Sequence, residues 1–283
     1  MPSAHQPFTM FRKHPRTLHV LQATNLVPFS ELLHGISTRH GGVSTGPYRS
    51  LNLSFDVGDL KERVLQNYHR LSRMLHFDLS SLVTCQQVHH NAIALIDESY
   101  LNRGCYHPEK VVPATDGLAT NVPGITLLTR YADCVPLLFF NPEKQAAAIA
   151  HAGWKGTLAR IGPSMVDLLS AQFKCRPDRT LVMIGPSIGP CCYYVSSSMA
   201  DLATRELPPA EQRFVTATGG QLAFDLWDAN RKQLIAAGIK ENNIFSAERC
   251  TSCNTDLFFS YRKEAKATGR FGAFIGLKRR DGT

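Results

Sequence analysis

The spacing of apolar positions along the chain predicts three amphipathic helices. They are expected at 60–75, 162–174 and 226–238. Asp59 and Asp225 stand directly before the first and the third helix, where a capping side chain is favoured. Pro163 lies in the first turn of the second helix, and Gly238 ends the third, which are the positions that suit these two residue types.

Short apolar runs bounded by turn residues predict strands. The runs are 125–129, 136–140, 146–151, 181–185 and 271–277. Strands and helices are mixed along the chain without strict alternation. This order favours an α+β fold, a layered sandwich with mixed β-sheets and flanking helices, over a doubly wound sheet. The chain contains neither a G-x-G-x-x-G nor a G-x-x-x-x-G-K-[ST] pattern, which argues against a Rossmann turn or a P-loop.

Length and composition are those of a globular protein with a substantial core. The chain has 283 residues, of which 43% are hydrophobic and 19% charged. No repeat or long linker divides it, so we expect one domain over residues 23–283.

Residues 1–22 contain basic side chains and no acids, and we expect a basic N-terminal tail there. No apolar run could cross a bilayer and no secretory signal is visible, so we expect a cytoplasmic protein without a membrane partner.

The formal net charge of +8 suits binding of anionic small molecules. The basic residues are scattered and no known nucleic-acid module is present, so we predict no nucleic-acid partner. The 8 cysteines of a chain without a secretory signal are expected to be free thiols. Nothing in the sequence determines the oligomeric state.

One Cys-x-x-Cys motif is formed by Cys250 and Cys253. A zinc ribbon needs a second pair at ribbon spacing, whereas Cys191 and Cys192 are adjacent and far away in the sequence. We therefore expect Cys250 and Cys253 to be reduced, to hold no structural zinc and to lie outside the catalytic site.

A candidate site follows from one predicted hairpin. Cys134 precedes the strand at 136–140, His151 ends the strand at 146–151, and the turn residues Asn-Pro-Glu-Lys join the two strands. A hairpin brings Cys134 and His151 to the same end of the sheet. A third ligand could come from His89 or His90, at the end of another apolar segment. Two imidazoles and one thiolate would leave one position open on a metal ion, as in catalytic zinc sites. A Cys–His nucleophile pair and plain core packing are the alternatives.

Seven motifs, in chain order, resemble one known family. They are STRHGGVSTGPYRSLNLSFDVGD (37–59), QQVHHN (86–91), TDGLAT (115–120), ADCVP (132–136), HAGWKG (151–156), GPSIGPCCYYV (185–195) and FFSYRKE with TGR (258–270). Together they are similar to the YfiH-like laccase-domain family, variously described as polyphenol oxidase, purine nucleoside phosphorylase or peptidoglycan editing factor.

The resemblance implies an α/β-layered fold and a metal ion bound by His89, Cys134 and His151, which would also be the catalytic residues. One cysteine and two histidines suit either Zn²⁺ or Cu²⁺. The sequence departs from the family pattern at three positions. His90 follows the ligand histidine where glycine is usual, Tyr194 stands where glutamate is usual, and Lys155 stands where arginine is usual.

The name laccase implies multicopper oxidase chemistry, but the sequence lacks the histidine pairs that would bind the copper ions. The trinuclear centre of a multicopper oxidase uses several His-x-His pairs, and the 11 histidines contain none. A single metal ion fits better. The resemblance then implies purine nucleosides and phosphate as substrates, with phosphorolysis of adenosine, inosine or methylthioadenosine and deamination of adenosine.

Further residues of the quoted motifs are candidates for substrate binding. Arg39, Tyr261 and Arg262 could supply cations or a stacking ring, although Arg39 could equally stabilise a turn. Asp133 could orient a ligand histidine or cap its turn. His40 and Gln87 are expected near the pocket.

Two other functions compete with the nucleoside enzyme. The first is a metal-free Cys–His hydrolase, with Cys134 as nucleophile and His151 as base, that could act on peptidoglycan precursors. The second is a copper-dependent polyphenol oxidase.

Overall fold

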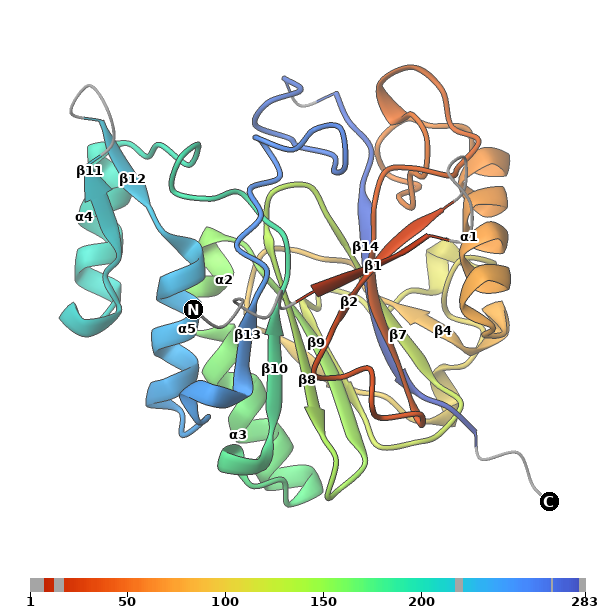
Figure 1. Ribbon diagram of the computed structural model, residues 1–283, viewed down its shortest axis with the longest axis horizontal. Coiled ribbons are helices and arrows are strands. Elements are labelled where there is room, and N and C mark those ends of the chain that lie inside the picture. The colour runs from red at the N-terminus through yellow and green to blue at the C-terminus, as the bar shows by residue number, and fades with distance from the viewer. Residues whose placement is uncertain (1–7, 13–17, 217–220, 266, 280–283) are drawn as a thin grey trace, which may run out of the picture.

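Two six-stranded β-sheets lie face to face, and helices cover their outer faces (Figure 1). The computed structural model describes residues 8–12, 18–216, 221–265 and 267–279. The α+β prediction of a layered sandwich with mixed sheets and flanking helices is confirmed.

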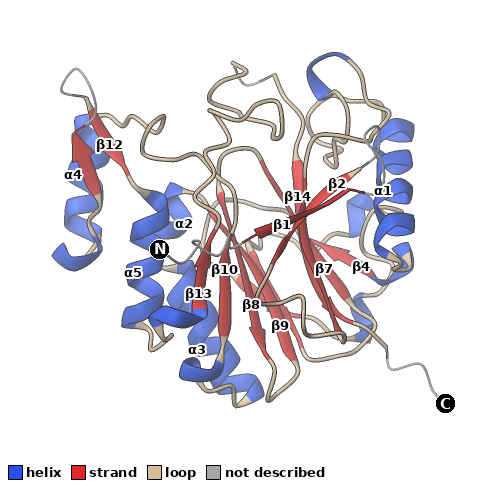
Figure 2. Ribbon diagram, in the orientation of Figure 1, coloured by secondary structure: helices blue, strands red, loops and turns tan. Residues whose placement is uncertain are grey.

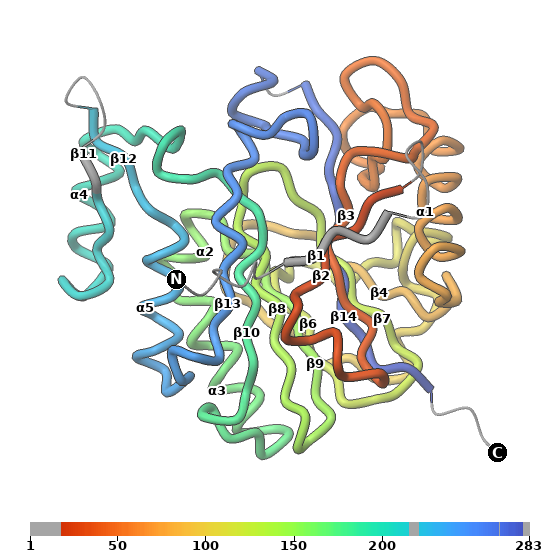
Figure 3. Tube along the Cα trace, viewed as in Figure 1, coloured from red at the N-terminus to blue at the C-terminus, as the bar shows by residue number. Residues whose placement is uncertain are grey.

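The first sheet has the strand order β1-β2-β3-β14-β7-β4. Its strands are β1 (Phe8–Arg12), β2 (His19–Ala23), β3 (Leu32–Ser37), β14 (Phe271–Leu277), β7 (Thr126–Tyr131) and β4 (Leu82–Thr84). All neighbours are antiparallel except β4 and β7. The last strand of the chain lies between β3 and β7, as the blue trace in Figure 3 shows. Both ends of the chain are therefore needed to complete this sheet.

The second sheet has the order β13-β10-β8-β9-β6-β5. Its strands are β13 (Ile244–Ser246), β10 (Leu181–Ile184), β8 (Val135–Asn141), β9 (Ala146–Ala152), β6 (Gly117–Thr120) and β5 (Ile93–Leu95). Both edge strands pair in parallel with their neighbours, and the inner pairs are antiparallel. A separate hairpin of β11 (Phe214–Thr216) and β12 (Leu222–Phe224) lies beside α4 (Ser197–Glu206), at one end of the molecule (Figure 2).

Three apolar clusters hold the layers together. Between the sheets, Leu127 and Ile275 of the first sheet share a buried cluster with Leu138 and Ile149 of the second. Helix α1 (Lys61–Leu75) covers the outer face of the first sheet. Helices α3 (Ile161–Phe173) and α5 (Leu226–Ala236) cover the second sheet, next to the short α2 (Trp154–Leu158). Short 3-10 turns lie at Gly46–Tyr48, Leu79–Ser81, Glu98–Tyr100, Pro108–Lys110, Pro177–Arg179, Pro209–Glu211 and Glu241–Asn243.

The helix ends agree with the sequence patterns at Pro163, Asp225 and Gly238 but not at Asp59, and Pro163 lies in the first turn of α3 as expected. The Asp225 side chain accepts hydrogen bonds from the backbone of Trp227 and Asp228, so it caps α5 as expected. Gly238 lies just beyond that helix with a φ of 92°, a conformation that glycine adopts without strain. Asp59, however, does not cap α1: the N-terminal cap is Leu60, and the Asp59 carboxylate accepts from the Leu60 and Asn52 nitrogens instead.

The N-terminal segment differs from the expected basic tail. Within residues 1–22, Phe8–Arg12 forms β1, and β2 begins at His19 and pairs with β3. Residues 1–7 and 13–17 lie outside the described part of the chain. These strands were not predicted because their apolar residues alternate with polar and basic ones, so neither forms a continuous apolar run, although β2 lies inside the sheet with Val20, Leu21 and Ala23 buried. None of the described helices is long and apolar enough to span a membrane.

Candidate metal centre

The predicted hairpin between β8 and β9 is present and brings the cysteine and the histidine together. Pro136 pairs with His151 in the register of the two strands. Cys134 comes directly before β8 and therefore lies beside the end of β9. The strand residues between them are fully buried, which fixes the register because a slip by one residue would reverse every side chain.

His89 is the third member of the group. The ligand atoms of His89, Cys134 and His151 all lie within 4.8 Å of one another. The two imidazole rings meet edge to face, with centroids 4.8 Å apart. His90 does not belong to this group, so the geometry favours His89 over its neighbour.

Asp116 connects the two histidine segments, although no sequence pattern predicts a role for it. It lies just before β6 and is completely buried. His151 Nδ1 lies 2.8 Å from Asp116 Oδ1, which directs the other ring nitrogen of His151 toward the group. The same carboxylate accepts the backbone N–H groups of Val88, His89 and His90 at 3.1, 3.0 and 2.9 Å. It therefore fixes the orientation of the His151 ring and the conformation of the loop that carries His89. His89 itself has a left-handed φ of 63°.

The electrostatics of the site favour a thiolate beside a protonated imidazole when no ion is bound. Burial by itself raises the pKa of Cys134, but the charge of His151 and hydrogen bonds from His151 and His89 lower it to about 6. Burial by itself lowers the pKa of His151, but the Cys134 thiolate and the hydrogen bond with Asp116 raise it to about 9. A thiolate is the form that binds a metal ion or acts as a nucleophile.

The space around the group suits a small ion. A Cβ atom on Gly153 would lie 2.9 Å from Cys134 Sγ and 3.3 Å from His89 Cδ2, so only glycine leaves this approach free. One thiolate and two imidazoles are also the donor types that Zn²⁺ and copper accept. The residues therefore fit a bound metal ion.

A cavity of about 730 Å³ lies directly over these three residues. Its walls carry three arginines and several rings. The lining residues are Ser54, Asp56, Val57, Gln86, Gln87, His89, Arg130, Ala132, Asp133, Cys134, His151, Trp154, Ile188, Tyr193, Leu226, Tyr261, Arg262 and Arg270. This volume and mixture of cations and rings suit a small aromatic ligand with an anionic group.

Two of the arginines were missed by sequence reasoning. Arg130 lies on β7, and its backbone N–H and carbonyl are both bound by the Gln87 side chain at 2.9 Å. Arg270 lies just before β14 and has its guanidinium over the Tyr261 ring, 5.6 Å from the centroid. Burial lowers the pKa of Arg270, although its guanidinium stays charged at neutral pH. Gln87 and Tyr261 thus lie at the cavity as expected.

Arg262 and Asp133 also line the cavity and contact each other. The Arg262 backbone N–H donates to Asp133 Oδ2 at 2.6 Å, and Thr251 donates its hydroxyl to Oδ1 at 2.6 Å. The Arg262 guanidinium lies over the Tyr193 ring, 5.1 Å from its centroid. Asp133 therefore links its own loop to the segment that carries Thr251 and Arg262. The carboxylate that orients a ligand histidine is Asp116 instead.

Arg39 does not line the cavity. Its guanidinium bonds to Glu264 Oε1 at 2.9 Å and to the Thr255 carbonyl at 2.7 Å, and it stacks over Phe259 at 4.5 Å. The substrate-binding prediction for Arg39 is therefore replaced by its alternative, a stabilising contact between two loops. His40 also lies away from the cavity lining, with its ring 5.3 Å from that of His19.

The altered family positions have different surroundings. Tyr194 is exposed and donates its hydroxyl to the Cys191 carbonyl at 3.0 Å, so it is not part of the cavity. The Lys155 ammonium lies 5.5 Å from the centroid of the Trp154 ring, which lines the cavity.

The fold and site together define a β-sandwich protein in which a His–Cys–His group that could hold a metal ion lies under a cavity rich in arginine. The chain belongs to the multi-copper polyphenol oxidoreductase laccase family, whose family model matches residues 33–278. This laccase-like family implies metal binding. Within the described residues, the two groups that could hold an ion are this one and a cluster of four cysteines.

Similar proteins have names in nucleoside chemistry. Purine nucleoside phosphorylase YlmD from Geobacillus stearothermophilus is 42% identical over 89% of this chain and 92% of its own length. Adenosine deaminase RL5, from an unknown prokaryotic organism, is 32% identical over 89% of this chain and 97% of its own length. The crystal structure of the Geobacillus YlmD superposes with a TM-score of 0.88 at 40% identity, and covers 95% of this chain and 99% of that one.

Proposed function

We propose that this chain is a metal-dependent purine nucleoside enzyme. It would cleave adenosine, inosine and methylthioadenosine with phosphate, and deaminate adenosine. The observation that carries the proposal is the His89, Cys134 and His151 group at the base of a cavity with three arginines. The names of the similar relatives support the same substrates.

His89, Cys134 and His151 would hold the ion, and we propose Zn²⁺, with Cu²⁺ as the alternative. Nucleoside cleavage and deamination involve no electron transfer, so an ion without redox chemistry is sufficient. When bound, Zn²⁺ would lower the pKa of a water molecule or polarise an attacked atom. Asp116 would keep His151 in the tautomer whose second nitrogen faces the ion.

The cavity walls account for substrate binding. Arg130, Arg262 and Arg270 present positive charge to phosphate, whose oxygen forms a bond to C1′ as the bond from C1′ to the purine nitrogen breaks. The purine leaves with the electron pair of that bond. Trp154 and Tyr193 supply rings against which a purine can stack.

A Cys–His hydrolase acting on peptidoglycan precursors is the second candidate. It is favoured by one observation, the close approach of Cys134 Sγ and the His151 ring, which also lowers the pKa of the thiol, as a thiol nucleophile requires. In that reaction His89 would have no essential part, so the three-residue group itself supports the metal enzyme.

The test combines metal analysis with turnover of inosine, adenosine and methylthioadenosine, with and without phosphate. His89→Ala, Cys134→Ala and His151→Ala should each lose the ion of this site and turnover together. His90→Ala is the matched control, because this neighbouring histidine lies outside the group, and it should keep both. An active metal-free preparation, or a covalent acyl adduct on Cys134, would support the hydrolase instead.

We also propose that the protein is located in the cytoplasm. It is supported by the free state of the cysteines, which is typical of a reducing compartment.

A further inference from the structure

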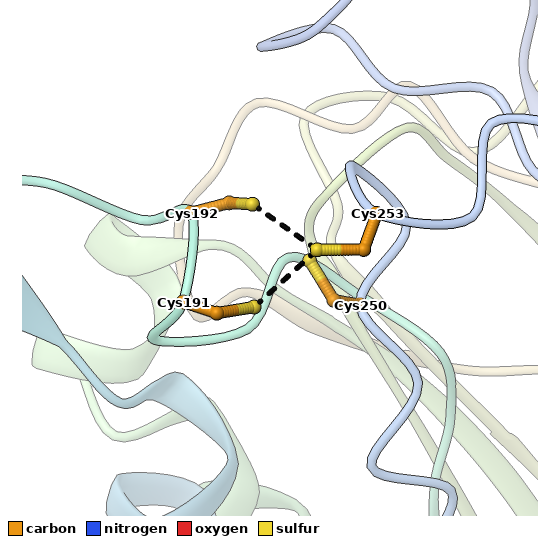
Figure 4. Close-up of side chains that lie close together, drawn as sticks. All are labelled: Cys191, Cys192, Cys250 and Cys253. Atoms are coloured by element: carbon orange, nitrogen blue, oxygen red, sulfur yellow. Dashed lines mark hydrogen bonds between the residues drawn. The ribbon is translucent and has the colours of Figure 1, made fainter.

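Four cysteines gather at a second place, outside the cavity. Two adjacent cysteines come from the loop after β10, and the Cys-x-x-Cys pair comes from the loop after β13 (Figure 4). The cluster consists of Cys191, Cys192, Cys250 and Cys253, whose sulfur atoms all lie within 4.8 Å of one another. The second pair that the Cys-x-x-Cys motif needed is therefore present in space, which corrects the expectation based on sequence spacing.

The sulfur positions suit one tetrahedral ion. Four thiolates about 2.3 Å from a zinc ion would lie about 3.8 Å from one another. Cys253 Sγ lies 3.6 Å from Cys191 Sγ and 3.4 Å from Cys192 Sγ, and the four residues are free thiols. Cys250 is buried, whereas Cys191 and Cys253 are exposed, so an ion could reach the cluster from solvent.

The backbone holds both loops in place at the cluster. Thr251 donates its N–H to the Ser187 carbonyl at 3.0 Å, so the loop after β13 runs alongside the loop after β10, as Figure 3 also shows. Cys192 and Tyr193 both donate their N–H groups to the Gly189 carbonyl, at 3.0 and 2.9 Å. These bonds form a tight turn that directs the adjacent thiols toward the other loop.

We propose that Cys191, Cys192, Cys250 and Cys253 bind one zinc ion, which is a structural site distinct from the His89, Cys134 and His151 centre. Binding replaces the thiol protons by the metal ion and releases them to solvent, without any change of oxidation state. Four protein ligands fill the coordination of zinc, so this site would have no open position for a substrate.

The zinc ion would fix one wall of the cavity. Arg262, which lines the cavity, donates from Nη1 to the Tyr194 carbonyl at 3.1 Å. Tyr193, directly after the adjacent cysteines, lies under the same guanidinium. A zinc ion that joins the two loops would therefore hold Arg262 and Tyr193 in position. Under the proposed function, loss of the bridge should raise KM more than it lowers kcat.

The experiment measures zinc per chain in the purified full-length protein by mass spectrometry. Wild type should hold two ions, Cys253→Ala and Cys250→Ala one, and Cys134→Ala one. Cys175→Ala is the matched control, because Cys175 is a buried free thiol outside both groups, and it should keep two. Circular dichroism reports the fold of each variant. If Cys250→Ala does not fold, the exposed Cys191→Ala serves in its place.

Cobalt distinguishes the two sites by their ligands. Added Co²⁺ should give an intense thiolate charge-transfer absorption in Cys134→Ala, from the four-cysteine site alone. The proposal would be overturned if the wild type held one ion, and if Cys134→Ala lost this ion while Cys253→Ala kept it. Iron or a disulfide in the four-cysteine cluster would also overturn it. The zinc count of Cys134→Ala does not depend on turnover. It therefore tests the four-cysteine site even if the proposed nucleoside activity is absent.

Discussion

Replacing Asp116 by asparagine tests the link between the buried carboxylate and the metal centre. The side chain keeps its size, but one of its two acceptor oxygens becomes an NH₂ group. Oδ1 accepts from His151 Nδ1 and the His89 N–H, and Oδ2 accepts from the Val88 and His90 N–H groups. In either orientation, the new NH₂ group faces two donors and two hydrogen bonds are lost.

The magnitude follows from these contacts. Hydrogen bonds to a charged group contribute about 1.5–3 kcal/mol each, so the loss of two costs about 3–6 kcal/mol in stability. Loss of the carboxylate partner of a ligand histidine lowers metal affinity about 10–100-fold, which corresponds to about 1.4–2.7 kcal/mol. Because the stability of a domain is about 5–15 kcal/mol, we expect a folded protein that unfolds more easily and binds its ion more weakly.

The assay is urea unfolding together with competition for zinc against a chelator. Asp225→Asn is the control, because this carboxylate caps α5 through two backbone N–H groups, a position that asparagine also fills well. It should retain both stability and zinc affinity. Unchanged unfolding together with unchanged zinc affinity in Asp116→Asn would refute the assignment, because either orientation of the asparagine loses two of the four hydrogen bonds.

Three further predictions follow from the packing, the burial and the topology. Gly153→Ala should lose the ion of the His89, Cys134 and His151 centre while keeping the fold, because its Cβ would lie 2.9 Å from Cys134 Sγ, whereas Gly162→Ala, with no contact closer than 3.5 Å, should keep that ion. Burial lowers the pKa of His34 to about 4. Between this value and about 6.5 only the unfolded chain binds the proton, so stability should fall with decreasing pH by about 1.4 kcal/mol per unit. His34→Gln should show a smaller fall between pH 7 and pH 5 in urea titrations, and an equal fall would contradict the assignment. The full-length chain should unfold in one transition, and two separately folded halves after limited proteolysis would argue against one domain.

The sequence by itself determined the features that arise from residues close together in the chain. The hairpin of β8 and β9 is one example, because a short turn and two apolar runs specify it locally. It was sufficient to place Cys134 beside His151. The Asp225 cap and Gly238 at the two ends of α5 are also local, since each depends on the conformation of one or two residues.

Only the tertiary structure decided which distant residues meet. Asp116 joins His151 because β6 and β9 are neighbours in the second sheet, and no local pattern marks that aspartate as a partner. Arg39 was excluded from the cavity because its guanidinium is held by Glu264, 225 residues further along the chain. The two cysteine pairs are separated by some 60 residues and meet because their loops follow neighbouring parallel strands, β10 and β13. Strand order depends on the packing of the whole core, so sequence spacing alone could not show these contacts.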